Sequence, residues 1–294
     1  MKLAGLKNSL LELIRKTSSE LPKDVEEALQ RGRQSEAKGS RGEYALAVIG
    51  DNIEMAAESS LPLCQDTGTI TFYVEGPAGF DQLQFVREAR KAVSKATQIG
   101  YLRQNSVDSL TGRNSGDNLG PGTPVFHFHQ WKKNSVDVRL ILKGGGCENV
   151  SAQYSLPDSR LNAGRDFEGI IRVCLDAVLQ AQGKGCGPGI LGICVGGDRA
   201  TGYDAAKAQF LRSMNDRSEE ADLEKLEITV LEMGNQLGIG PMGFGGRTTL
   251  LGVKAVKLNR LPASFFVSIS YMCWAFRRQG VLLDPNGNIR KWLY

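Results

Sequence analysis

The sequence lacks the features of a membrane-spanning or nucleic-acid-binding protein. None of its 294 residues lies in a run that approaches the roughly 18 apolar residues of a spanning helix. It has no dense basic run and a net charge of only +4, so we expect neither a membrane nor a nucleic acid as partner. Residues 1–20 carry charges in every helical turn and no small-residue cleavage site, which predicts an amphipathic helix and a cytoplasmic protein.

The six cysteines lack Cys-x-x-Cys spacing, which excludes a zinc ribbon and a thioredoxin-type motif. In a reducing compartment, where disulfides are rare, each cysteine is buried, reactive or metal-bound. Cys174 and Cys194 lie in apolar runs and are expected in the core. The other four lie beside turns and polar residues: Cys64, Cys147, Cys186 and Cys273. Three thiolates from separate loops can hold a [4Fe–4S] cluster and leave one iron open, although scattered cysteines are more often structural.

Glycine, in contrast, is abundant, and its 35 residues cluster between 112 and 252. Two segments, 187–192 and 238–243, match the dinucleotide fingerprint GxGxxG. That loop must leave a strand and open a helix, whereas the first segment leads into a predicted strand and the second follows a predicted helix. A nucleotide-dependent oxidoreductase is therefore an alternative that rests on these two matches alone.

The hydrophobic periodicity predicts an α+β (mixed α/β) fold with a helical N-terminal portion, about residues 1–60, and one domain over residues 1–294. Further helices are expected at 82–103, 167–182, 203–216 and 218–236. Strands are expected at 69–76, 125–131, 136–146, 189–197, 249–258 and 263–274. There is no internal repeat and no low-complexity linker.

The segments 125–131 (VFHFHQW) and 136–146 (VDVRLILKGGG) are predicted to form an antiparallel pair of strands. His127 and His129 then alternate onto one face of the first strand. Because no third metal ligand is evident, an edge-strand pair without function is a better interpretation than a metal site.

Polar residues surround the four loop cysteines. Asp66, two residues after Cys64, is either a general acid/base or the turn-forming residue of the segment DTG. The segment 143–149 (KGGGCEN) could direct backbone N–H groups at an anion. Four arginines could bind a carboxylate through two hydrogen bonds: Arg103, Arg247, Arg277 and Arg278. Arg103 ranks first, because it lies beside the Gly/Asn-rich loop.

Six ordered segments resemble the α subunit of the two-subunit, iron–sulfur class I fumarases and L-tartrate dehydratases. They are LPLCQDTGT, LRQNSVDSLTGRNSGDN, KGGGCENVSA, GCGPGILGICVGG, GIGPMGFGGRTT and LPASFFVSISYMCWAFRR. The resemblance covers nearly the whole chain. It implies a hydro-lyase that adds or removes water on a small hydroxy-dicarboxylate.

The resemblance also implies roles for individual residues. The ligands of a [4Fe–4S] cluster would be Cys64, Cys186 and Cys273. The residues that meet the substrate would be Gln65, Asp66, Arg103, Gly146 and Asn149, with Asp66 assisting proton transfer. Cys147 stands where the family commonly has serine, which agrees with its being no ligand.

Two departures from the family pattern bear on the substrate. The usual Cys-Pro-Pro-Gly is Cys-Gly-Pro-Gly at 186–189, which keeps the turn. Where the family has the histidine of Thr-His-Pro-Ala-Ser, this sequence has Leu261. The substrate could therefore be malate or fumarate, tartrate or a branched hydroxy acid. Whether Arg260 takes over the role of the histidine also stays open.

The family's chemistry also needs a second, β-type module with further catalytic residues. We therefore expect a separate β subunit and a hetero-oligomer. A non-catalytic carboxylate-binding subunit that has lost its cluster is the third candidate.

Overall fold

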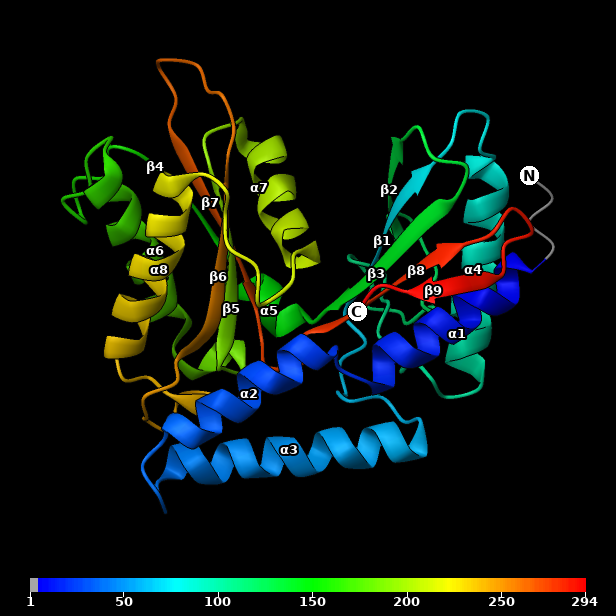
Figure 1. Ribbon diagram of the computed structural model, residues 1–294, viewed down its shortest axis with the longest axis horizontal. Helices are drawn as coiled ribbons and strands as arrows, with labels where there is room; N and C mark the ends of the chain where they lie inside the picture. Colours follow the sequence, from blue (N-terminus) through cyan, green and yellow to red (C-terminus); the bar gives the residue numbers. More distant parts are fainter. Residues whose placement is uncertain (1–4) are drawn as a thin grey trace. The chain divides into compact units, whose positions relative to one another are not determined.

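The computed structural model describes residues 5–294, which fall into two compact units. Unit 1 comprises the chain up to Lys23, residues 50–145 and residues 275–294; unit 2 comprises residues 24–49 and 146–274. Figure 1 labels the elements of both. Each unit has its own sheet and is described by itself.

Unit 1 is built on a five-stranded sheet with the order β2-β1-β3-β8-β9. Its strands are β1 (Thr69–Gly76), β2 (Val125–Gln130), β3 (Val136–Lys143), β8 (Arg277–Leu283) and β9 (Ile289–Trp292). Only the β1–β2 pair is parallel. The central position of β1 and β3 explains why both are almost entirely buried.

One face of this sheet carries the core of unit 1. Helices α1 (Leu6–Ser19) and α4 (Gln82–Gln98) bury apolar stripes in this core. Phe72 of β1 stacks on Phe126 of β2, and Phe85 of α4 meets both rings edge-on. Asp81 begins α4, because its carboxylate accepts the N–H of Gln84 as an N-cap.

The predicted pairing of segments 125–131 and 136–146 is wrong. β1 lies between them, parallel to β2 and antiparallel to β3. Alternation identifies a strand and its two faces, but it does not select the neighbour. Here the aromatic stack between β1 and β2 adds to the interactions of that pair.

Unit 2 contains a four-stranded sheet with the order β4-β7-β5-β6. Its strands are β4 (Ala152–Ser155), β5 (Gly189–Val195), β6 (Leu250–Lys257) and β7 (Phe266–Met272). β5 and β6 are parallel, and β7 runs antiparallel to both of its neighbours.

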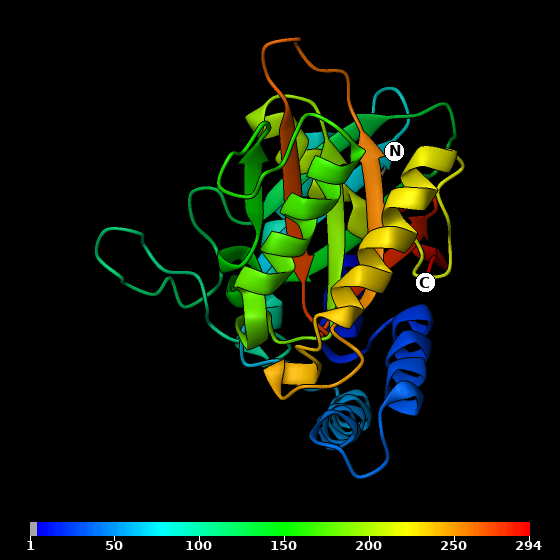
Figure 2. The same ribbon diagram turned by 90° about the vertical axis from the view of Figure 1, so that its left-hand side faces the viewer.

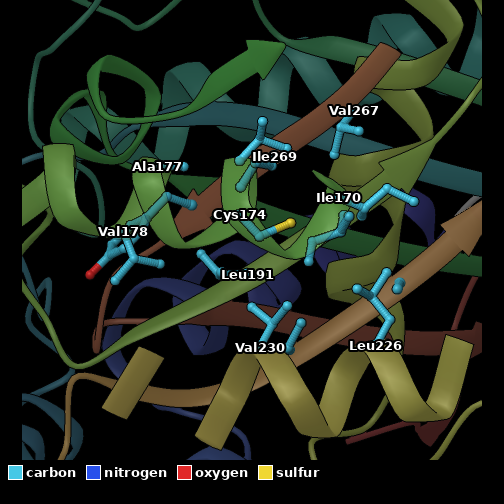
Figure 3. Close-up of a cluster of buried hydrophobic side chains, with 14 of the residues drawn as sticks. Ile170, Cys174, Ala177, Val178, Leu191, Leu226, Val230, Val267 and Ile269 are labelled. Carbon is cyan, nitrogen blue, oxygen red and sulfur yellow. The ribbon is translucent and has the colours of Figure 1, made fainter. Parts of the chain in front are cut away.

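Helices cover both faces of this sheet. On one face, α6 (Phe167–Ala181) and α8 (Ala221–Gln236) pack on branched side chains, including Leu191 of β5 and Ile269 of β7 (Figures 2 and 3). On the other, α7 (Arg199–Ala208) approaches so closely that a Cβ atom at Gly192 would lie 2.1 Å from the Ala206 carbonyl oxygen. Gly192 therefore leaves room for α7 on one face of β5, whereas the other face carries branched side chains.

The helical N-terminal portion is confirmed over the described residues by α1, α2 (Lys23–Ser35) and α3 (Arg41–Ser59); residues 1–4 lie outside them. A short helix, α5 (Gly145–Asn149), and the single turns η1 (Gln182–Gly185), η2 (Gln209–Leu211) and η3 (Pro241–Gly243) complete the elements. The α+β fold is confirmed, although β4, β8 and β9 were not predicted. In the described part of the chain, no helix is long and apolar enough to cross a membrane.

Candidate active site

The loop after α3 places Asp66 at the end of β3 in unit 1. Its Oδ1 accepts the N–H of Gly68 at 2.8 Å, which is the turn that the DTG segment predicts. Its Oδ2 accepts the N–H of Gly145 at 2.6 Å, in the segment KGGG. The Asp66 N–H in turn points to the sulfur of Cys64 at 3.4 Å. Asp66 thus links the first candidate cysteine, through its backbone N–H, to the glycine segment, through its carboxylate.

A second loop of unit 1, which carries Arg103, is tied to the first. The buried Thr67 hydroxyl donates to the Arg103 carbonyl at 2.7 Å and accepts the Arg103 N–H at 2.9 Å. Asn118, which is also buried, donates to the same carbonyl and accepts the N–H groups of Asn105 and Ser106. The backbone of Arg103 is therefore fixed beside the Asp66 loop, while its side chain is exposed.

A cavity of about 320 Å³ lies where these loops meet. Asp66 and Gly145 form part of its wall, together with residues of the 105–107 and 122–123 segments. Its volume suits a small organic acid, and polar groups such as Asn105 and Asn118 line it beside the carboxylate.

Arg277 is a residue of this region that the sequence analysis ranked below Arg103. It is 1% exposed, and its Nε is enclosed without a hydrogen-bond partner in the described structure. A Cβ atom at Gly144 would lie 3.9 Å from Arg277 Nη2 and 3.2 Å from Asp66 Oδ2, so the guanidinium adjoins the Asp66 loop. Arg277 is the first residue of β8, a strand that the sequence analysis did not predict. Had that strand been predicted, Arg277 could have been identified as a buried cation.

Unit 2 contains the other two candidate ligands. Cys186 follows η1 with a left-handed backbone (φ +52°), and its side chain is exposed. Cys273 directly follows β7 and is buried. The N–H of Trp274 donates to the Cys186 carbonyl at 3.3 Å, which brings the two cysteine-bearing segments together.

Helix α5 approaches the same loop in unit 2. A Cβ atom at Gly146 would lie 3.6 Å from the Lys184 carbonyl oxygen, so Gly146 adjoins the Cys186 segment. Asn149, three residues further along, is exposed. Unit 2 therefore brings Gly146 close to the Cys186–Cys273 pair.

The predicted site residues thus form two groups. Unit 1 holds Cys64, Gln65, Asp66 and Arg103; unit 2 holds Gly146, Asn149, Cys186 and Cys273. Within residues 5–294, no three His, Cys, Asp or Glu side chains gather as a metal-binding group. In donor chemistry, however, the loop cysteines suit iron: Cys186 is exposed beside the segment of Cys273, and the Cys64 sulfur already accepts a backbone N–H.

Cys174 and Cys194 lie in the core, as predicted. Both are fully buried on α6 and β5. Burial raises the pKa of the Cys194 thiol to about 11 and raises that of Cys174 still further, because the thiolate would lose its hydration. These two cysteines behave as small apolar side chains.

The features that favoured other functions have structural explanations. β2, which carries both histidines, is an edge strand, as predicted, and His127 stacks on Tyr73 with ring centroids 4.6 Å apart. The segment 187–192 runs into β5, and 238–243 runs from α8 into a single turn, η3. Neither segment connects a strand to a following helix of a nucleotide-binding unit.

The loop that contains Leu261 is held by the side chain of Arg260. Arg260 Nη1 lies within hydrogen-bonding distance of the carbonyls of Leu261, Pro262 and Ser264, and its guanidinium stacks on Phe265 at 4.4 Å. Leu261 itself is 73% exposed. Arg260 therefore shapes its own loop.

Comparison with known proteins agrees with this arrangement of motifs. The chain belongs to the fumarate hydratase (Fumerase) family, whose model matches residues 7–281. It is 54% identical over 293 residues to a protein named "Putative fumarate hydratase class I" from Geobacillus stearothermophilus. That match covers 98% of this chain and 57% of the relative, so the chain spans little more than half of the relative's length.

Two further relatives have α-subunit names. The protein "Putative L(+)-tartrate dehydratase subunit alpha" of Methanocaldococcus jannaschii is 33% identical over 274 residues, which cover 92% of this chain and 94% of the relative. The L(+)-tartrate dehydratase subunit alpha of Escherichia coli K12 is 29% identical over 271 residues, covering 92% and 88% respectively.

Proposed function

We propose that this chain is the α subunit of a hydro-lyase that reversibly adds water to, or removes it from, a small hydroxy-dicarboxylate such as malate. The observation that carries the proposal is the Asp66 carboxylate, which joins the Cys64 loop to the glycine segment at the wall of a cavity of about 320 Å³. The family membership and the names of the relatives support the reaction class.

The proposed cofactor is a [4Fe–4S] cluster held by Cys64, Cys186 and Cys273. When bound, a cluster with three cysteine ligands supplies an open iron that acts as a Lewis acid on the carboxylate and hydroxyl of the substrate. The loop positions of these cysteines, in contrast to the buried Cys174 and Cys194, support the assignment.

Asp66 is the proposed proton-transfer group of this chain. Its two backbone hydrogen bonds fix the direction of the carboxylate, so that it can accept or return a proton without reorientation. Gln65, Arg103, Gly146 and Asn149 are the proposed substrate-binding residues. Arg277, a buried guanidinium beside Asp66, is suited to balance negative charge there.

The partner that we propose is a β subunit. Two relatives are named as α subunits, and one of them has nearly the same length as this chain. We further propose that residues 1–294 act as one catalytic domain and that the protein is cytoplasmic, which the six free cysteines support. L-tartrate is the alternative substrate, because two relatives are named as subunits of an L(+)-tartrate dehydratase.

The test is a ligand scan in protein purified without oxygen. Wild type and Cys194→Ala should contain about one cluster per chain, whereas Cys186→Ser should contain none, measured as iron, sulfide and visible absorption. Malate and tartrate dehydration are then assayed with the β subunit present. A Cys186→Ser variant with full cluster content would refute the ligand assignment, and a colourless wild type would refute the proposed cofactor.

A further inference from the structure

Glu36, which directly follows α2 in unit 2, has a buried carboxylate. The residue is 8% exposed. Its Oε1 accepts the N–H groups of Arg247 and Thr248 at 2.9 and 2.8 Å, and its Oε2 lies 3.0 Å from the Arg247 nitrogen. Hydrogen bonds to an ionised carboxylate are stronger than those between neutral groups. The connection between α2 and α3 therefore holds the chain just before β6.

The end of α2 makes further hydrogen bonds to the same two residues. Arg247 Nη1 donates to the Ser35 carbonyl at 3.2 Å, and the Ser35 and Thr248 hydroxyls are 3.1 Å apart. A Cβ atom at Gly246 would lie 2.7 Å from Glu36 Oε2, closer than real Cβ atoms approach. The chain before β6 therefore needs glycine at this position to come so close to the carboxylate.

The 238–248 segment, which this carboxylate holds at its end, packs against the loop of Cys186. The Met242 N–H donates to the carbonyl of Gly187, the residue after Cys186, at 2.9 Å. A Cβ atom at Gly183 would lie 2.7 Å from the Met242 carbonyl oxygen. The segment thus contacts the loop both before and after Cys186 in the chain.

The loop and the segment each contain a residue whose backbone conformation is rare outside glycine. φ is +52° at Cys186 and +53° at Met242. Such conformations persist where the surrounding contacts fix them. The loop also packs on a buried ring of β7, since a Cβ atom at Gly185 would lie 2.5 Å from Cε1 of Tyr271. The Cys186 loop therefore has two supports, this ring and the 238–248 segment.

We propose that Glu36 is a positioning residue for the Cys186 loop. Its hydrogen bonds to Arg247 and Thr248 fix the 238–248 segment, and this segment fixes the loop. That the loop carries a cluster ligand rests on the proposed function; that Glu36 fixes the loop does not. A ligand on a fixed loop loses less conformational freedom when the cluster binds, so the cluster should be held for longer.

The action of Glu36 on the loop is tested by hydrogen exchange on the chain without cluster. Glu36→Ala should speed exchange of the Cys186 and Met242 amides about tenfold or more, because hydrogen bonds to a charged group are lost. The amides of Val173 and Ile269, at buried positions of α6 and β7, should exchange as in wild type. Unchanged exchange at Cys186 and Met242, or equal acceleration at all four amides, would overturn the positioning role.

Conservative variants separate the reach of the side chain from its charge. Glu36→Gln keeps the length and an oxygen that can accept both N–H groups, so exchange at Cys186 and Met242 should stay within about threefold of wild type. Glu36→Asp keeps the charge but is one methylene shorter, so it should exchange as fast as the alanine variant. The comparison of these two variants also stands if Glu36→Ala does not fold, and equal exchange in both would overturn the inference.

Glu43→Ala is the matched control for loss of a carboxylate. Glu43 lies in the first turn of α3 and accepts the N–H of Gly39 at 2.6 Å, within the same connection between α2 and α3. It should leave exchange at Cys186 and Met242 unchanged. Acceleration equal to that of Glu36→Ala would assign the effect to the connection as a whole and overturn the role of Glu36.

The consequence for the cluster is tested on the anaerobic, loaded chain. Glu36→Asp should lose its cluster in air about fivefold faster than wild type, the equivalent of about one hydrogen bond, and Glu36→Gln should not. An unchanged cluster lifetime in Glu36→Asp, with faster exchange in its loop, would overturn the link to the cluster alone. A wild type that binds no cluster would refute the proposed function, and hydrogen exchange would still decide whether Glu36 fixes the loop.

Discussion

At the scale of single residues, the contacts of Asp66 fit both its turn and the chemical role proposed for it. Both of its oxygens accept backbone N–H groups, one within its own turn and one from Gly145. The two interpretations that the sequence left open are therefore compatible: the turn directs the carboxylate toward the cavity that it lines.

Replacement of Asp66 by Asn should lower turnover by about a hundredfold or more, because the proposed proton-transfer group is lost. The amide NH2 would also face a backbone N–H, so a modest loss of stability of about 1–3 kcal/mol is expected. Turnover of the reconstituted enzyme and thermal unfolding measure the two effects separately.

Asp284→Asn is the matched control for this experiment. Asp284 also accepts backbone N–H groups, those of Asn286 and Asn288, in the turn before β9 of the same unit. It should lose stability without losing turnover. Equal turnover in both variants would leave Asp66 with its turn-forming role only.

At the scale of elements, the surroundings of two glycines differ. Gly192 of β5 has the Ala206 carbonyl of α7 where a side chain would be, whereas Gly50 of α3 has open space around it. Sequence periodicity treats both as helix- or strand-weakening glycines. The packing gives them opposite consequences.

Gly192→Ala should therefore destabilise the protein by about 1–3 kcal/mol or more, since the methyl group overpacks the contact with α7. Gly50→Ala should stabilise it by about 0.5–1 kcal/mol, because alanine reduces the freedom of the unfolded chain and fits a helix. Urea unfolding of the pair measures both. Destabilisation by the two substitutions alike would contradict the difference in packing.

A charged network ties β6 to the segment before α8 in unit 2. Asp216 accepts hydrogen bonds from Arg212 at 2.9 and 3.0 Å and from the buried Lys254 at 2.7 Å. Burial alone would raise the pKa of Asp216, but the hydrogen bonds and charges of Arg212 and Lys254 outweigh it and lower the pKa overall. A carboxyl with a lowered pKa in the folded state stabilises the protein above its unfolded pKa.

This contribution should be lost as the pH falls from roughly 5 to 2, through the pKa of the folded state. At pH 7, Asp216→Asn should reduce the free energy of unfolding by about 0.5–1 kcal/mol, because solvent screens this partly exposed carboxylate, and near pH 2 the variant and wild type should converge. Asp51→Asn, at an exposed position of α3, should have no such pH-dependent effect. A constant difference between Asp216→Asn and wild type at all pH values would contradict the role of the ion pair.

At the scale of the whole molecule, the lengths of the relatives suggest how the active enzyme is assembled. The chain spans 57% of the class I relative but 94% of the archaeal α-subunit relative. We therefore predict that the chain binds its cluster alone and shows no dehydratase activity until a β subunit is added. Anaerobic reconstitution with and without that subunit measures this, and activity from the single chain would overturn the two-subunit proposal.

The sequence by itself determined the secondary structure where one periodicity was strong. Helices α1, α4, α6 and α8 and the strand β5 were predicted because their apolar residues recur at helical spacing or in one continuous run. The sequence also distinguished Cys64, Cys186 and Cys273, which lie beside turns and polar residues, from the buried Cys174 and Cys194.

Only the tertiary structure decided which segments meet. Contacts between residues far apart in the chain set three features: the order β2-β1-β3, the burial of Arg277 at the start of β8 and the packing of Tyr271 against the Cys186 loop. Local patterns are set by the backbone periods of 3.6 and 2.0 residues, which act within a few residues. Strand neighbours, buried cations and close glycine contacts are set by side-chain packing across the fold, which no local period encodes.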